Sequence, residues 1–199
     1  PWHVLIEVAG DPAVLRGQLE DLLGAALSAG TIADATLAAS EAQAEALWTL
    51  RESISPAERA KGPAVQHDIA VPVEAMPAFI EEARARIESD WPGTRAFGFG
   101  HLGDGNIHFH VAAPPGADAA SWDAGDGKAI SRTVHDLVTA AQGTISAEHG
   151  IGQMKLDELE RLADPVALAL MRQVKAALDP RGLLNPGKLV SLAPQPPTA

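Results

Sequence analysis

Histidines are concentrated in the stretch HLGDGNIHFH, residues 101–110, which holds three of the seven in the chain around a Gly-Asp-Gly turn. The turn reverses the chain, so His101 on the incoming strand is expected to lie beside His108 on the outgoing strand. Two imidazoles on one face of a sheet can chelate a divalent cation when a third ligand joins them. Histidines on the polar face of a strand are usually only solvated or hydrogen-bonded, so the spacing permits a metal site and does not establish one.

A third ligand is available in the stretch SAEHGIG, residues 146–152. Glu148 offers a carboxylate, His149 follows it directly, and Gly150 and Gly152 allow the backbone to turn tightly and leave room for a ligand. Two histidines and one carboxylate with open positions suit Zn²⁺ or a similar cation that acts as a Lewis acid. The Gly-Asp-Gly turn lacks the Lys-Ser/Thr of a P-loop and the context of a dinucleotide fold, so it predicts no phosphate site.

Hydrophobic spacing predicts the strands and helices that would position these residues. The expected strands are Trp2–Gly10, Ala64–Val73, 95–101, 106–113 and a short one at the start of 144–152. The expected helices are 11–30, Ser40–Ser55, 76–91, 126–143 and 163–180. Ser40 is the expected N-cap of the second helix, Pro77 opens the third, and Gly143 ends the fourth.

Side chains alternate between the two faces of a strand, and this separates the core from the histidines. Ile107, Phe109 and Val111 are expected to point into the core, whereas His108 and His110 point the other way. Strands separated by helices, with one clear hairpin, predict an α+β fold in which an antiparallel sheet has helices packed mainly on one face.

Composition narrows the class of protein. The chain has 199 residues, of which 46% are hydrophobic, so it can bury a sizeable core. It contains no cysteine, which removes disulfides and thiolate chemistry. A net charge of −11 argues against nucleic-acid binding. We find no apolar stretch long enough to span a membrane and no secretory signal at the start. A cytoplasmic protein is expected; a peripheral position at a membrane and a homodimer are left open.

Three motifs together resemble the C-terminal domain of FAD-linked oxidases. They are GHLGDGNIHFHV, GTISAEHGIGQMK and LDPRGLLNPGK, in this order and spacing. This family includes D-lactate dehydrogenases, glycolate oxidases and D-2-hydroxyglutarate dehydrogenases, within the vanillyl-alcohol-oxidase fold group. The resemblance covers essentially the whole chain, from Trp2 to the NPGK motif.

The resemblance implies that this chain is one part of a two-part enzyme. Residues 1–190 would form a ferredoxin-like cap domain over the isoalloxazine that carries the substrate and metal site. An N-terminal domain absent from this chain would hold FAD, since we find no glycine-rich FAD-binding segment here. A strand that begins at Trp2 fits a cut at such a domain boundary, and the Pro-rich residues 191–199 are expected to form a disordered tail.

The resemblance also assigns roles to the histidines. The family's metal ligands fall on His101, His108 and Glu148, and its catalytic base falls on His149. The cation would bind the substrate hydroxyl and one carboxylate oxygen, which lowers the pKa of the hydroxyl. His149 would take the proton as the C2 hydride leaves, and a neighbouring cation favours the neutral imidazole that a base needs.

Two residues match positions that hold the far carboxylate of the substrate in hydroxyglutarate-type members. Arg51 and Ser55 lie four apart, so they are expected to share one helix face. An arginine suits a bidentate contact with a carboxylate. Taken alone, Arg51 would be an ordinary solvated arginine, and only the LWTLRESI context favours the substrate role.

Other positions match or depart from the family pattern. Asn106 is expected to contact substrate. His110 stands where hydroxyglutarate-type members carry Asn, so it is a substrate contact, a fourth ligand or a spectator. Gln66 stands where these members carry Lys, which weakens the case for a dicarboxylate. Asn185 is expected to face the flavin edge, and Lys155 also matches a family position, with a purely structural role left open.

The expected function is the substrate-binding part of a flavin-dependent dehydrogenase that oxidises a D-2-hydroxy acid to the 2-oxo acid, with hydride transfer to FAD. The substrate, whether 2-hydroxyglutarate, lactate or glycolate, is left open, and the sequence does not name the electron acceptor. The isolated chain is expected to fold without dehydrogenase activity. The alternative is a non-catalytic domain that kept the fold for oligomerisation or partner binding. Intact residues at His101, His108, Glu148 and His149 disfavour it.

Overall fold

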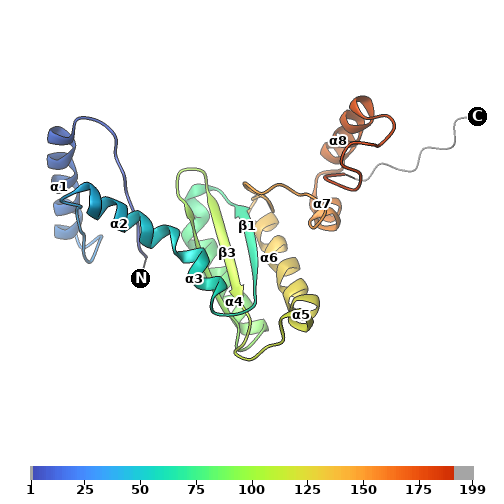
Figure 1. The fold of residues 1–199 in the computed structure, drawn as a ribbon, viewed down its shortest axis with the longest axis horizontal. Coiled ribbons are helices and arrows are strands. Elements are labelled where there is room, and N and C mark those ends of the chain that lie inside the picture. Colours follow the sequence, from blue (N-terminus) through green and yellow to red (C-terminus); the bar gives the residue numbers. More distant parts are fainter. Residues whose placement is uncertain (1, 191–199) are drawn as a thin grey trace, which may run out of the picture. The chain divides into compact units, whose positions relative to one another are not determined.

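The structure, a computed structural model, describes residues 2–190, which form two compact units, one up to Lys61 and one from Gly62 onward (Figure 1). The expected tail over residues 191–199 lies outside the described residues. None of the helices formed by residues 2–190 has both the length and the apolar character that a membrane span requires.

The first unit consists of the helices α1 (Pro12–Ser28), α2 (Glu41–Glu52) and α3 (Ile54–Arg59). The predicted helix over 11–30 is confirmed as α1. The predicted N-cap Ser40 is also confirmed, because its side chain accepts a hydrogen bond from the main-chain N–H of Gln43 at the start of α2.

Two predictions for the first unit were wrong. The helix expected over Ser40–Ser55 is divided at Ser53, so Arg51 and Ser55 lie on different helices. Pro56 accounts for the break, since it has no N–H to donate to the carbonyl four residues earlier. Trp2–Gly10 does not form a strand. The first unit has no other described strand with which it could pair, so its alternating pattern does not lead to a sheet.

The second unit is built on a three-stranded antiparallel sheet. Its strands are β1 (Ala64–Ala70), β2 (Arg95–His101) and β3 (Asn106–Ala112), in the order β1-β3-β2. The predicted hairpin of β2 and β3 is confirmed. β1 is shorter than predicted and ends before the 3₁₀ turn Val73–Ala75. The short strand expected at residue 144 is reduced to a single bridge between Thr144 and Ala70.

One face of this sheet packs against α4 (Met76–Asp90) and α6 (Lys128–Ala140), both of which were predicted (Figure 1). The core that they enclose is continuous and apolar, and its most deeply buried members include Ile69, Ile87, Ile107, Phe109, Val111, Ile130, Val134 and Val138. Burying each such side chain stabilises the fold by roughly 1.5–3 kcal/mol. The predicted α+β fold, with helices against one face of an antiparallel sheet, is confirmed.

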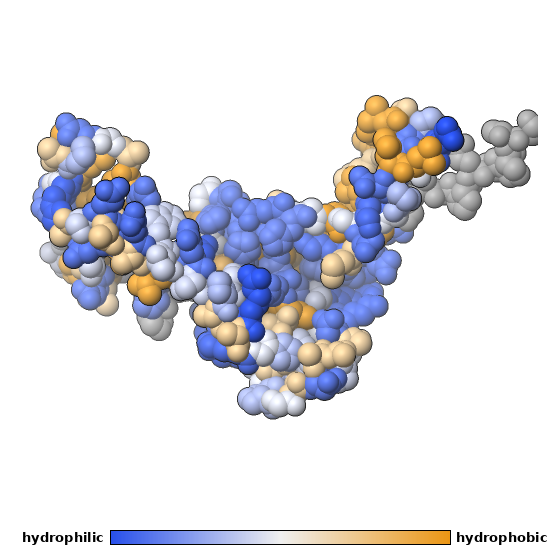
Figure 2. Space-filling view, in the orientation of Figure 1, coloured by the Kyte–Doolittle hydropathy of each residue, from blue (hydrophilic) through white to orange (hydrophobic). Residues whose placement is uncertain are grey.

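The remaining elements of the second unit are shorter or less buried. The short helix α5 (Ala119–Trp122) and a π-helical turn (Asp123–Gly127) lead into α6. Helix α7 (Leu156–Leu162) was not predicted, whereas α8 (Pro165–Leu178) was. Large apolar side chains of α8 are exposed, as the orange surface in Figure 2 shows; they are Val166, Leu170, Met171, Val174 and Leu178. The apolar spacing that predicts this helix therefore does not mark a buried face here.

Two glycines bring the turns of the second unit close to β1. Gly105, in the turn between β2 and β3, has a φ of 76°, and a Cβ there would lie 2.0 Å from the carbonyl oxygen of Val71. A Cβ on Gly143 would lie 2.2 Å from the carbonyl oxygen of Ala70. Only glycine fits such approaches, so these positions fix the hairpin turn and the segment after α6 beside the end of β1.

Candidate active site

The sheet face opposite α4 and α6 carries the polar and aromatic residues of the candidate site. In the register of the strands, His108 of β3 stands between Asp68 of β1 and Phe99 of β2. His110 stands in the same way between a glutamine and a phenylalanine, and this face includes Gln66, Asp68, Phe97, Phe99, His101, Asn106, His108 and His110. The predicted alternation of β3 is confirmed, because Ile107, Phe109 and Val111 are all buried in the core on the other side.

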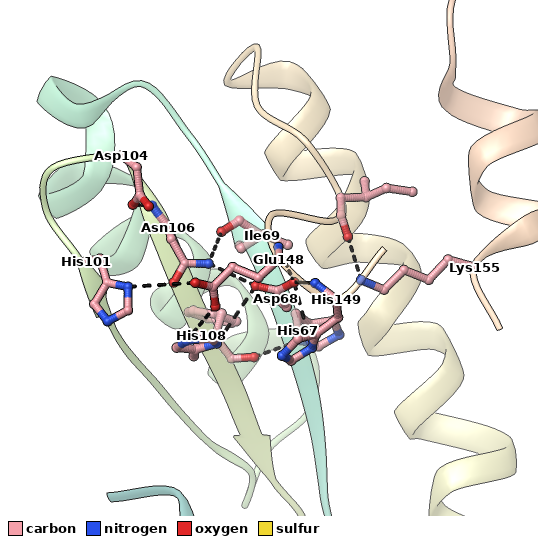
Figure 3. Close-up of polar contacts among 12 residues, drawn as sticks. His67, Asp68, Ile69, His101, Asp104, Asn106, His108, Glu148, His149 and Lys155 are labelled. Atoms are coloured by element: carbon pink, nitrogen blue, oxygen red, sulfur yellow. Dashed lines mark hydrogen bonds and ion pairs between the residues drawn. The ribbon is translucent and has the colours of Figure 1, made fainter. Parts of the chain in front are cut away.

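His101, His108 and Glu148 come together on this face (Figure 3). The rings of His101 and His108 have centroids 6.3 Å apart on neighbouring strands. One carboxylate oxygen of Glu148 lies 3.9 Å from Nδ1 of His101, and the other lies 3.6 Å from Nε2 of His108. A carboxylate from a distant part of the chain therefore bridges the two imidazoles, in the arrangement that the sequence led us to expect.

The segment that carries Glu148 is tied to the edge of β1 by its main chain. Ala70 and Thr144 exchange two main-chain hydrogen bonds, and the N–H of Ala147 donates to the carbonyl of Asp68 at 3.2 Å. Farther along, the ammonium of Lys155 donates to the carbonyl of Ile145 at 2.9 Å, which links the two ends of the segment. Lys155 thus has a structural contact, in line with the structural role that was left open for it.

Tight turns follow directly after the candidate base. Gly150 and Gly152 have φ values of 72° and 56°, in the left-handed region that favours glycine. A Cβ on either residue would meet no atom within 4 Å. The expected role of these glycines in turning the backbone is confirmed, and the space beside them is open.

His149 is the most exposed member of the group. Its side chain is 68% exposed, and its ring stacks on that of His108 with centroids 6.0 Å apart. Nδ1 of His149 lies 3.7 Å from an oxygen of Asp68. An exposed imidazole beside the bridged pair is accessible to a small molecule that binds there.

Asp68 is the residue of this site that the sequence analysis missed. It is 3% exposed, and its Oδ2 accepts the main-chain N–H groups of Glu148 and His149 at 2.8 and 2.7 Å. Oδ1 accepts from the amide of Asn106 at 2.9 Å. Burial on its own would raise the pKa of the Asp68 carboxyl, but these hydrogen bonds together lower it below its ordinary value. The signal was an acidic residue in the middle of a predicted strand.

A set of possible ligand atoms other than the predicted one clusters most closely. Among the described residues, the set that presents one atom each within 4.8 Å of one another is Asp68, Glu148 and His149, and it shares only Glu148 with the predicted ligands. Three lone pairs of Asp68 already accept hydrogen bonds from N–H donors. This carboxylate is therefore better suited to fixing the neighbouring backbone and the Asn106 amide than to binding a cation. Glu148 belongs to both sets, and its carboxylate bridges the two strand histidines.

The other predicted site residues of the second unit differ in how far they are buried. His110 is buried against Phe97 and Phe99, with ring centroids 5.4 and 5.0 Å away. Asn106 is buried, and its amide is directed at Asp68. Asn185 is exposed, with a left-handed φ of 45°.

Two predicted substrate residues belong to the other unit. Arg51 and Ser55 lie in the first unit, on α2 and α3 respectively. The structure describes them within that unit.

Comparison with known proteins identifies relatives. Among curated proteins, the mitochondrial D-2-hydroxyglutarate dehydrogenase of Bos taurus is 36% identical over 191 residues, which are 96% of this chain and 34% of the relative. The D-2-hydroxyglutarate dehydrogenases of Xanthomonas citri pv. viticola and Stutzerimonas stutzeri are each 35% identical, over 95% of this chain and 40% of their own lengths. The chain therefore spans between 34% and 40% of the length of these relatives.

The family comparison covers nearly the whole chain. Residues 1–189 match the family described as FAD linked oxidases, C-terminal domain. This is the family that the three sequence motifs resemble. A match over that length, together with 36% identity to a relative, means that the chain belongs to the family of FAD-linked oxidase C-terminal domains.

Proposed function

We propose that this chain supplies the metal site and the catalytic base of an FAD-dependent dehydrogenase that oxidises D-2-hydroxy acids. The observation that carries the proposal is the carboxylate of Glu148, which lies 3.9 Å from His101 Nδ1 and 3.6 Å from His108 Nε2. A bridging carboxylate on two imidazoles, with an exposed histidine next to them, combines cation binding with proton transfer.

The donor atoms are of the kinds that hold a divalent cation. Nitrogen and oxygen ligands of Zn²⁺ lie about 2.0–2.2 Å from the ion, so neighbouring tetrahedral ligands are about 3.4 Å apart. The separations of 3.6 and 3.9 Å end on different oxygens of Glu148, so the side chains would have to rotate for all three to hold one ion. We propose Zn²⁺ as the cation, held by His101, His108 and Glu148. When bound, it would act as a Lewis acid on a substrate hydroxyl, and FAD would accept the hydride.

Other side chains of this chain are proposed to transfer the proton, exclude water and face the flavin. His149 accepts the hydroxyl proton, because it is the most exposed of the four side chains and adjacent to the three proposed ligands. Loss of a positioned base typically costs about 10²–10⁴ in rate. Phe97, Phe99 and His110 form a largely apolar wall beside the ligands, which limits water near the reacting atoms. Asn185 faces the flavin, which we propose is held mainly by a domain outside this chain.

D-2-hydroxyglutarate is the proposed substrate. The relatives reported above carry that substrate in their names, and Arg51 provides a guanidinium for a second carboxylate. Ser55 would add a hydrogen bond to the same carboxylate. Gln66 in place of lysine removes one cation from this pattern, so D-lactate and glycolate are the competing substrates.

Anaerobic flavin reduction tests the proposal. The chain is joined to an FAD-binding domain and mixed with D-2-hydroxyglutarate, D-lactate or glycolate, while the flavin absorbance is followed. Faster bleaching by D-2-hydroxyglutarate than by D-lactate or glycolate, and none by L-2-hydroxyglutarate, is expected, and the chain without that domain should show no turnover. Failure of all substrates to reduce the bound flavin would favour the alternative of a non-catalytic binding domain.

A further inference from the structure

The carboxylate of Asp68 lies at the centre of the candidate site and is almost completely enclosed. It is directly opposite His108 in the register of β1 and β3, and it lies beneath the segment that carries Glu148 and His149. Burying a charge is costly unless donors compensate it. Three N–H donors do so here, and all three come from residues of the site: Asn106, Glu148 and His149.

The first consequence concerns the backbone. Two consecutive main-chain N–H groups, those of Glu148 and His149, converge on the single atom Oδ2 of Asp68. Charge-assisted hydrogen bonds of this length are about twice as strong as neutral ones. One oxygen on a rigid strand therefore fixes the positions of both the carboxylate ligand and the base relative to the sheet.

The second consequence concerns the two rings. Oδ1 of Asp68 lies 3.9 Å from Nδ1 of His108, and Oδ2 lies 3.7 Å from Nδ1 of His149 (Figure 3). These distances are longer than hydrogen bonds, so the carboxylate faces both Nδ1 atoms without bonding to them. A carboxylate facing Nδ1 favours a proton on that nitrogen, which leaves the lone pair on Nε2. Nε2 of His108 is the atom that faces Glu148.

The third point concerns the orientation of the carboxylate itself. Asn106 is buried, and its Nδ2 donates to Oδ1 of Asp68. Asn106 follows Gly105, the glycine that permits the close turn against β1. The hairpin turn therefore places the buried amide of Asn106, and that amide in turn orients the carboxylate of Asp68.

We propose that Asp68 is a positioning residue that places the ligand Glu148 and the base His149 together and favours the tautomers of His108 and His149 whose lone pair is on Nε2. Its anchoring of the segment is a property of the chain alone. Its effect on metal binding and catalysis rests on the proposed function. Asn106 supports it by holding the carboxylate in one orientation.

The anchoring is tested on the chain without metal, by amide hydrogen exchange resolved for each residue. In the wild type, the N–H groups of Glu148 and His149 should exchange more slowly than those of Gly150 and Gly152. Asp68→Asn removes the charge and should speed exchange at both anchored positions by about tenfold to a hundredfold, since an unmade buried hydrogen bond costs about 1–3 kcal/mol. The sheet amides should not change.

A matched control variant separates the loss of the Asp68 hydrogen bonds from the general effect of removing one negative charge. Glu82→Gln removes one exposed carboxylate on α4 and should leave the exchange of Glu148 and His149 unchanged. If Asp68→Asn does not fold, the wild-type comparison alone decides the matter. Exchange at Glu148 and His149 as fast as at the following glycines would overturn the proposal.

The ring orientation and the metal provide two further readouts. Imidazole ¹⁵N shifts should show the proton on Nδ1 of His108 and His149 in the wild type and a mixture of tautomers in Asp68→Asn. Affinity for Zn²⁺ should fall by about tenfold to a hundredfold in the variant. Slow amide exchange at Glu148 and His149 without any Zn²⁺ binding would support the anchoring by Asp68 and contradict the proposed metal site. Unchanged tautomers and Zn²⁺ affinity in Asp68→Asn would contradict the positioning role.

Discussion

The carboxylate of Glu148 lies 3.6 Å from Nε2 of His108, although the two residues belong to different segments that meet only in the folded chain. The strand histidine is placed by the sheet register, and the glutamate is placed by main-chain hydrogen bonds to β1. The geometry of the site therefore depends on the fold of the second unit and on the turns that bring its segments together.

One such turn can be tested by a pair of alanine substitutions. Gly105 and Gly116 both have left-handed φ values, 76° and 82°, but only a Cβ on Gly105 would meet a backbone atom. Gly116→Ala should cost about 1–3 kcal/mol of unfolding free energy from backbone strain alone. Gly105→Ala should cost more, because the carbonyl of Val71 must also move. Urea unfolding measures both, and equal losses would show that the close approach carries no cost.

Acid should destabilise the fold through a buried histidine on the core face of the sheet. His67 contacts the carbonyl of Phe109 and the hydroxyl of Ser131, and burial lowers the pKa of its imidazole to about 3 from 6.5. Between these values the unfolded chain binds a proton that the folded chain does not. The free energy of unfolding should therefore fall as the pH drops below 6.5, by up to about 1.4 kcal/mol per pH unit for this group.

A variant isolates this contribution. His67→Asn retains an N–H donor that can reach the carbonyl of Phe109 but cannot titrate. Its unfolding free energy, measured by urea between pH 7.5 and 5, should change less with pH than that of the wild type. His135 adds to the wild-type slope with the same sign, because burial also lowers its pKa. Identical slopes in the two proteins would show that His67 does not contribute.

Substrate selectivity tests Arg51. In the FAD-containing assembly, Arg51→Ala should lower kcat/KM for D-2-hydroxyglutarate by about tenfold to a hundredfold, because a charged hydrogen bond is worth about 1.5–3 kcal/mol. The value for D-lactate, which lacks the second carboxylate, should change little. Arg16→Ala, on α1 of the same unit, serves as the control. An equal loss for both substrates would remove Arg51 from the recognition of the far carboxylate.

The hairpin of β2 and β3 could be predicted because its strands are neighbours in sequence and their alternation is local. The pattern of Trp2–Gly10 was as strong, but a strand also needs a partner, and alternation does not reveal one. The break at Ser53 was accessible from Pro56, whose missing N–H disrupts a helix at a known distance.

The candidate site was predicted more completely on its exposed side than on its buried side. His101, His108, Glu148 and His149 lie in motifs of recognisable composition. Asp68 was missed because its partners Glu148 and His149 lie 80 and 81 residues away, and they present main-chain N–H groups that no sequence motif shows.

The division between metal ligands and base gives the most direct test. Metal content and flavin reduction are measured side by side in the FAD-containing assembly for His149→Ala and His101→Ala. His149→Ala should keep nearly all of its metal and lose about 10²–10⁴ in rate, since the cation still polarises the hydroxyl but the proton has no acceptor. His101→Ala should lose both metal and turnover. Loss of metal in His149→Ala, or turnover near that of the wild type, would contradict the account.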